Sequence, residues 1–204
     1  MLDFTWIRGE IVDLIYDLGS LLTSPKTAFK IMVAEGRGVG YALATLVIFS
    51  LATSLSTVSA ISWIVRYLPA PLTSILFFGG VVMLAGTLLV IDIIAWLLMS
   101  LIAWGFSHAF GGEGDFSSTL MIYAYSWVGR VFYVVPALIA ALLTNPIAVA
   151  GLLGTGLILE FIAKLVIQVR GLQVVHELSG GKALATALLS VILLLLVMFA
   201  PAAL

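Results

Sequence analysis

The feature that most constrains this chain is a series of apolar tracts long enough to cross a lipid bilayer. A helix needs about 20 mostly apolar residues to span the hydrocarbon layer. Hydrophobic residues make up 63% of the chain and charged residues 9%, whereas about a quarter of the residues in a soluble domain are charged. The sequence therefore predicts an all-α integral membrane protein that forms a single domain over residues 1–204. The apolar tracts cover residues 40–64, 73–110, 117–143 and 147–203, and polar residues between 170 and 182 divide the last tract into two spans.

The second tract is too long for a simple span. At about 1.5 Å per residue, one helix over residues 73–110 would be about 57 Å long, far more than a single crossing requires. Two short helices could turn at Gly79 and Gly80, or an interfacial or re-entrant segment over 72–83 could lead into a span over 84–109. The sequence leaves open whether 73–83 instead belongs to one long helix.

The positions of the cations favour five spans, with the N-terminus in the cytoplasm and the C-terminus external. Lys and Arg in short loops accumulate on the cytoplasmic side of a membrane. A five-span arrangement places Arg66 alone outside, whereas a sixth span would divide the cations evenly. We therefore expect a multi-pass protein of the plasma membrane, with spans at about 40–64, 84–109, 117–143, 147–168 and 183–203. The cations expected on the cytoplasmic side are Arg8, Lys26, Lys30, Arg37, Lys164, Arg170 and Lys182.

One or two amphipathic interfacial helices are predicted before the first span, within residues 1–37. The stretch WIRGEIVDLIYDLGSLL places aliphatic residues at helical spacing, and its remaining face carries Arg8, Glu10, Asp13 and Asp17. A second helix is expected to begin at SPK, with Ser24 as N-cap and Pro25 in the first helical position. This helix would face the membrane with Phe29, Met32 and Val33, and the lipid headgroups with Lys26 and Lys30.

Charged residues also fall inside the predicted spans, where an ionised side chain costs roughly 3 kcal/mol unless it is compensated. Spans two and three run in opposite directions, which brings Asp92 and Arg130 to comparable depth. In the fourth span, Glu160 lies one helical turn before Lys164. An intramembrane polar network of Asp92, Arg130, Glu160 and Lys164 that locks the helices together is favoured. A solute or ion path lined by the same charges, and side chains that reach separately toward the headgroups, are the alternatives.

The segment HAFGGEGDFSS, residues 108–118, is the most distinctive polar stretch. A tight cytoplasmic turn is favoured, because glycines permit backbone conformations closed to other residues, and Asp115 or Ser117 would cap the next helix. GEGD also matches the Gly-x-Gly-Asp pattern of intramembrane aspartyl proteases. That chemistry needs two carboxylates that share a proton at depth, and neither Asp115 nor Asp92 is expected to lie suitably. A divalent-ion site at His108, Glu113 and Asp115 has only weak support, and we expect no metal or cofactor.

Other motifs of known chemistry are missing from the sequence. There is no Cys, which excludes disulfides and thiolate chemistry, and HELSG at 176–180 lacks the second His of a zinc-protease helix. No nucleotide-binding loop or Ser–His–Asp order is found. A net charge of −1 with scattered cations gives no surface for nucleic acid, and no cleaved signal peptide is expected. We therefore expect a protein that is not an enzyme.

The segment GLLGTG, residues 151–156, places small residues at close helical spacing. Such spacing permits tight helix contacts in lipid. Packing within the chain is favoured over dimerisation, so homo-oligomerisation stays an open alternative.

Three segments together make the chain resemble the Yip1 domain family over nearly its whole length. SPKTAFK before the first span is similar to the start of the family's domain. FGGEGDFSSTLMIYAYS resembles its glycine-pair loop and the following Tyr–Ser element, here Tyr125–Ser126. RGLQVVHELSGGKALATALL resembles its last loop and final span. The candidate partner surface consists of the two loops, with His108, Gly111, Gly112, Glu113, Gly114, Asp115, Phe116, His176 and Lys182.

The resemblance implies a five-span membrane protein that is not an enzyme. In eukaryotes the family is associated with Rab GTPase binding and with vesicle traffic between endoplasmic reticulum and Golgi. We expect no counterpart in this chain of the family's long cytosolic N-terminal region, since residues 1–24 hold no Asp-Leu-Tyr-Gly-Pro element, and the proline expected soon after the Tyr–Ser element comes only at Pro136. It looks like a short prokaryotic member, for which a Rab partner is not expected. The leading hypothesis is a scaffold or adaptor that contacts the lipid bilayer and a protein partner at its cytoplasmic face; the alternative is a small channel or transporter that uses the buried charges.

Overall fold

The computed structural model of the protein is all-helical. It describes the backbone of residues 5–65 and 70–199, and the side chains of residues 12–60, 79–80 and 82–197. Within this part of the chain, five helical segments are long and apolar enough to cross a membrane. This confirms the predicted fold class of five candidate spans after short N-terminal helices. The segments are Val39–Ala60, Val82–Ala109, Phe116–Ala140, Pro146–Val175 and Gly180–Val197.

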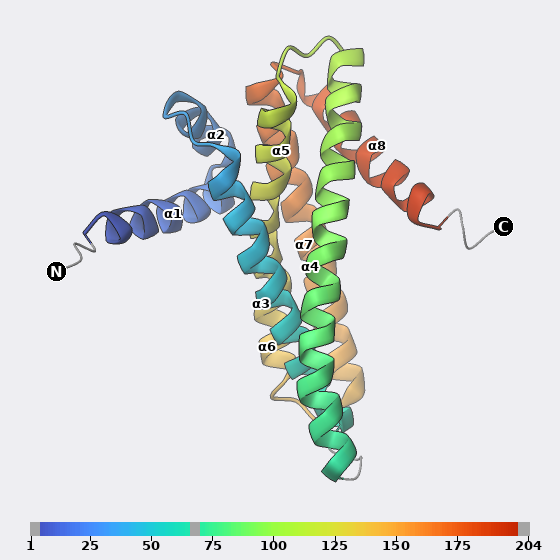
Figure 1. Ribbon diagram of the computed structural model, residues 1–204. Coiled ribbons are helices and arrows are strands. Elements are labelled where there is room, and N and C mark those ends of the chain that lie inside the picture. The colour runs from blue at the N-terminus through green and yellow to red at the C-terminus, as the bar shows by residue number, and fades with distance from the viewer. Residues whose placement is uncertain (1–4, 66–69, 200–204) are drawn as a thin grey trace.

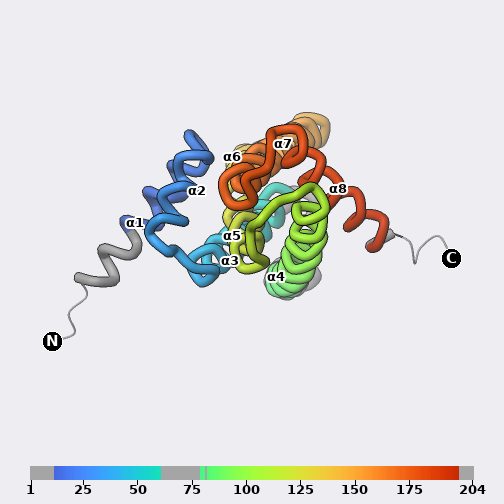
Figure 2. Tube along the Cα trace, turned by 90° about the horizontal axis from the view of Figure 1, so that it is seen from above, coloured from blue at the N-terminus to red at the C-terminus, as the bar shows by residue number. Residues whose placement is uncertain are grey.

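Four upright segments form the body of the bundle, and the two ends of the chain lean away from it on opposite sides (Figure 1 and, from above, Figure 2). We call the end with loops 110–115 and 176–179 the loop end; it lies at the top of Figure 1. The upright segments are α3 (Val39–Val65), α4 (Ala70–Ala109), the run of α5 (Phe116–Tyr125), η1 (Ser126–Arg130) and α6 (Val131–Ala140), and α7 (Pro146–Val175). The leaning ends are α1 (Thr5–Thr23) with α2 (Pro25–Ala34), and α8 (Gly180–Phe199).

The long second tract forms one helix, α4, of 40 residues. Neither a turn at Gly79 and Gly80 nor a separate segment over 72–83 is present, so both sequence alternatives that divided the tract were wrong. A glycine pair permits a turn but does not force one, and apolar residues on both sides continue the helical pattern. A helix longer than the bilayer is thick must tilt or extend beyond it, and α4 extends past the lower ends of α6 and α7 (Figure 1).

The third span is interrupted in the middle by the 3₁₀ turn η1, although the sequence predicts one continuous span. All five residues of η1 are buried. Its Gly129 lets α7 approach closely, because a Cβ there would lie 3.0 Å from the backbone nitrogen of Lys164. The turn therefore directs Arg130 into the bundle at the point where α7 contacts the backbone of η1.

The small residues of GLLGTG have two different surroundings. A Cβ at Gly156 would lie 3.2 Å from the Cα of Tyr133 on α6, so this glycine serves the packing within the chain that the sequence favoured. At Gly151 and Gly154, no neighbouring atom among the described residues lies within 4 Å of such a Cβ position, the helix's own backbone aside. These two glycines therefore make no close helix contact in the described part of the chain.

Helix α2 packs on the protein rather than on lipid, which corrects part of the prediction. Phe29 and Met32 are fully buried, and only Val33 of the three predicted membrane-facing residues is exposed. The Phe29 ring contacts Tyr125 edge-on and lies against Gly171 of α7, where the missing side chain leaves room for it. Pro25 begins the helix as predicted, but the Ser24 side chain makes no capping hydrogen bond.

The polar face predicted for α1 is also wrong at one residue. Asp17 is buried, with its Oδ2 2.5 Å from Nη1 of Arg37 in the segment between α2 and α3. Arg37 also contacts Glu35. Because this pair joins the end of α1 to the start of α3, it fixes the N-terminal helices to the bundle. Asp13 is exposed as expected, whereas the side chains of Arg8 and Glu10 lie outside the described residues.

Candidate functional site

The intramembrane charges meet in one buried cluster at the centre of the bundle. Arg130 of η1 donates two hydrogen bonds to Asp92 of α4, from Nη1 to Oδ2 at 2.5 Å and from Nη2 to Oδ1 at 2.7 Å. Its Nε donates to Oε1 of Glu160 on α7 at 3.3 Å. Lys164, one turn further along α7, donates to the same Glu160 oxygen. Two cations and two carboxylates therefore neutralise one another within contact distance.

Two neutral residues complete this charge cluster. Ser50 of α3 donates from Oγ to Oδ2 of Asp92 at 2.5 Å, so a fourth segment of the bundle joins the cluster. The ring of Trp127 lies 4.5 Å from the guanidinium carbon of Arg130 and 3.7 Å from Nζ of Lys164. An aromatic face attracts cations, and the attraction is stronger where the cations are largely removed from water. Asp92, Arg130 and Glu160 are each less than a tenth exposed.

Further polar contacts join the helices above and below the cluster. Gln168 of α7 donates to Oγ of Ser126 at 3.1 Å, and the hydroxyls of Tyr123 and Ser190 share a hydrogen bond of 2.9 Å between α5 and α8. Hydrogen bonds between spans stabilise a bundle in lipid, where the hydrophobic effect no longer drives helices together. Similar contacts join Thr57 to Tyr133 and the indole of Trp96 to the carbonyl of Leu120.

Sequence reasoning missed Ser50, Trp127 and Gln168 as members of these contacts. Trp127 lies three residues before Arg130, which is one signal that could have indicated the cation–π contact. Ser50 carried no such signal, because a serine in an apolar span most often bonds to its own helix.

At the loop end, the glycine loop packs its backbone directly on His176. A Cβ at Gly114 would lie 2.8 Å from Nδ1 of the ring, and a Cβ at Gly112 would lie 2.9 Å from the carbonyl oxygen of Ser107. Gly111 turns the chain with a φ of +86°, a conformation that side chains disfavour. The glycines at these positions thus permit a close approach that other residues would prevent.

His176 is fully buried beneath this loop and is neutral at pH 7. Its Nε2 lies 2.8 Å from the hydroxyl of Thr119, which itself donates to the carbonyl of Asp115 at 2.9 Å. Nε2 therefore carries the proton and donates to Thr119. Nδ1 has no hydrogen-bond partner among the described residues. Burial and, to a smaller extent, the neighbouring His108 lower the pKa of His176 and Asp115 opposes them, with a resulting pKa of about 4.

The remaining predicted residues of the two loops hold the loop end together or point to solvent. Asp115 caps α5 by accepting a hydrogen bond from the backbone nitrogen of Ser118 at 2.7 Å. Hydrogen bonding from Ser118 holds the pKa of the Asp115 carboxyl below its usual range. Lys182 donates to the carbonyl of Phe110 at 2.7 Å and so joins α8 to the loop. His108 and Phe116 both contact the Trp104 ring, and Glu113 is exposed.

The weaker chemical alternatives find no matching geometry. Asp92 is paired with Arg130 and Asp115 is a helix cap, so they do not form a carboxylate pair. Among the residues described, no group of three or more His, Asp or Glu side chains could hold a metal ion. The hydroxyl of Tyr123 bonds to Ser190, and that of Tyr125 has no hydrogen-bond partner in the described part of the chain.

Five apolar helical segments held together by buried polar contacts define a multi-span helical membrane protein. The family model of the Yip1 domain matches residues 19–200. The chain therefore belongs to the Yip1 domain family, which is linked to membrane trafficking and whose members are generally non-catalytic. No curated protein and no solved structure matches the chain.

Proposed function

We propose that this protein is a non-catalytic scaffold or adaptor that organises membrane and partners through its loop end. The neutral charge cluster is the observation that carries the proposal. Asp92, Arg130, Glu160 and Lys164 satisfy one another, which suits a role in holding four segments in a fixed arrangement. Function would then lie in the exposed polar residues at the loop end.

A small channel or transporter is the second candidate, and one cavity favours it. A cavity of about 200 Å³ between α4, α7 and α8 reaches Lys164, Gln168 and Trp127. Its other lining residues are apolar, and it is not lined by Asp92, Arg130 or Glu160. A conduction path would have to open the Asp92–Arg130 pair, at the cost of exposing a buried charge.

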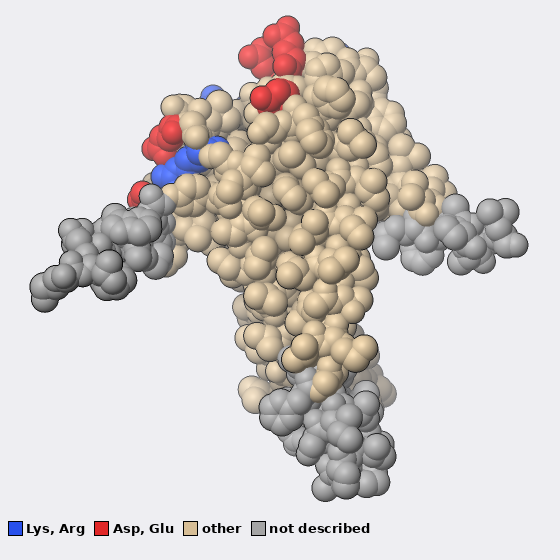
Figure 3. Space-filling model, in the orientation of Figure 1, with Lys and Arg blue, Asp and Glu red and all other residues tan. Residues whose placement is uncertain are grey.

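The proposal includes an orientation with the loop end in the cytoplasm of a plasma membrane. Lys164 was counted among the cytoplasmic cations in the sequence argument, but it belongs to the buried cluster and does not indicate orientation. The other described cations, apart from Arg130 in that cluster, lie toward the loop end and support this orientation. Figure 3 shows that the charged side chains coloured on one face gather toward that end and along α1 and α2. The cations concerned are Lys26, Lys30, Arg37, Arg170 and Lys182.

Single cysteines test this proposal directly, because the natural chain has none. Glu113→Cys and Ser179→Cys are placed at exposed positions of the two loops, and Asn145→Cys, exposed at the opposite end of the bundle, is the matched control. In intact cells, a membrane-impermeant thiol reagent should label position 145 alone. A cysteine crosslinker in native membranes should then give the same protein adduct from 113 and 179 and none from 145. External labelling at 179, or adducts at 145 only, would contradict the proposal.

A further inference from the structure

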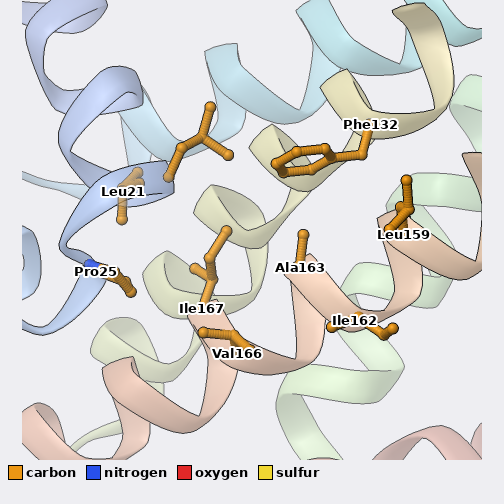
Figure 4. Close-up of a pocket in the computed structure, with 9 residues that line it drawn as sticks. Leu21, Pro25, Phe132, Leu159, Ile162, Ala163, Val166 and Ile167 are labelled. Atoms are coloured by element: carbon orange, nitrogen blue, oxygen red, sulfur yellow. The ribbon is translucent and has the colours of Figure 1, made fainter. Parts of the chain in front are cut away.

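An apolar groove lies between the N-terminal helices and the side of the bundle (Figure 4). Leu21 and Pro25 line one side of the groove, and Phe132 and Leu159 lie on the other, with residues 162–167 from the middle of α7 between them. The cavity has a volume of about 230 Å³ and is open on one side. Apart from backbone atoms, everything that lines it is hydrocarbon or an aromatic ring. An occupant must therefore present an apolar chain to it.

Further toward the loop end, α2 and α7 border a second cavity, which is open to the surroundings and has a cationic wall. Lys26 and Lys30 line it together with Gln173, and its volume is about 420 Å³. Both cavities lie between α2 and α7: Pro25 lines the apolar one, and Lys26, the next residue, lines the cationic one. Along α7, Val166 and Gln173 are two turns apart, which corresponds to about 10 Å.

The cations around this upper cavity lack a negative partner. Within residues 12–60 and 82–197, no carboxylate forms an ion pair with Lys26, Lys30 or Arg170. Arg170 instead donates to the Gln173 side chain at 3.0 Å. Lys26 and Lys30 are exposed and one helical turn apart, where two like charges repel each other. The repulsion between them would be relieved by a bound anion.

We propose that this groove binds one anionic phospholipid. Its phosphate lies between Lys26 and Lys30, and one acyl chain occupies the apolar cavity beneath. Charge complementarity selects this occupant, because the two lysines attract an anionic headgroup and the apolar cavity accepts a hydrocarbon chain. Basic pockets beside membrane helices bind lipid headgroups in this way. The groove lies on the α2 side of the bundle, apart from the loop surface of the proposed function, so the two proposals stand independently.

Thermal unfolding of the purified protein in detergent, titrated with phosphatidylglycerol or phosphatidylcholine, tests the proposal. Phosphatidylglycerol should raise the melting temperature with a saturable dose dependence, and phosphatidylcholine should raise it much less. The double variant Lys26→Gln/Lys30→Gln should weaken the apparent affinity for phosphatidylglycerol by about 30-fold. Lys182→Gln, which removes a cation outside the groove, should change it little.

The acyl part of the proposal has its own variant. Leu159→Trp places a large ring in the apolar cavity and should abolish most of the lipid-induced shift, whereas Leu157→Trp, on the exposed surface of the same helix and outside the groove, should not. Inorganic phosphate should not reproduce the shift. Equal shifts from both lipids, an unchanged affinity in the lysine double variant, or a full effect from phosphate alone would overturn the proposal.

Discussion

His176 is a buried histidine whose ring lies against the backbone of the glycine loop. Gly114 lies against the ring and Gly112 against the Cβ of His176, and the hydroxyl of Thr119 accepts a hydrogen bond from Nε2. A protonated ring would need a partner for Nδ1, and among the described residues it has none. The neutral form is therefore part of the native packing of the loop end.

We predict that the protein loses stability as the pH falls from 7 to 5. In the unfolded chain the His176 ring, with a pKa near 6.5, takes up a proton that the native ring, with a pKa of about 4, does not. Its contribution is complete above pH 6.5 and declines as the pH falls toward 4. The expected loss of unfolding free energy between pH 7 and pH 5 is about 2 kcal/mol.

The two histidines of the chain provide the control for this measurement. His176→Gln, which keeps a side chain able to donate to Thr119, should remove most of the pH dependence. His108→Gln, a change at an exposed ring, should keep it. An equal pH dependence in His176→Gln and the natural protein, followed by thermal unfolding in one detergent, would show that another group is responsible.

How much of the site could be predicted depended on the type of residue. The contact between Asp92 and Arg130 follows from sequence, because charges are rare in spans and both lie at similar depth in opposed helices. The packing of Gly112 and Gly114 on His176 joins segments about 60 residues apart, and no spacing rule predicts it. Likewise, Asp17 was assigned to a polar face because its partner Arg37 lies on another element.

At the scale of elements, the contact between α6 and α7 depends on a glycine in α7. Gly156 faces the backbone of α6, and Gly154, two residues earlier, faces open space. We predict that Gly156→Ala lowers the unfolding free energy by about 1–2 kcal/mol, because atoms of the α6 backbone and the Pro136 ring cannot easily move aside. Gly154→Ala should be neutral or slightly stabilising. Similar effects of the two substitutions on thermal unfolding would contradict this account of the contact.

The number of apolar spans was predictable, but their interior geometry was not. Hydropathy identifies each span because a bilayer demands a long apolar helix. It cannot detect the break at η1, which depends on the close approach of α7 at Gly129. It also gave no reason to prefer one long α4, because the length of a bilayer crossing does not limit how far a helix continues.

At the scale of the whole molecule, the charge cluster connects four segments that are distant in sequence. Ser50 belongs to α3, Asp92 to α4, Arg130 to η1 and Glu160 to α7. A neutral, buried cluster of this kind specifies how the segments meet, and its loss would affect the entire bundle. The central claim of the proposed function is that this arrangement is structural.

A double-mutant cycle on thermal unfolding in one detergent tests that claim most directly. Asp92→Asn or Arg130→Gln alone leaves the buried cluster with one uncompensated charge and should cost about 3–5 kcal/mol. The double variant should recover much of this loss, because Glu160 and Lys164 still neutralise each other. Additive losses in the double variant would contradict the structural pairing, and small losses in both single variants together with altered ion flux in liposomes would instead indicate a transport site.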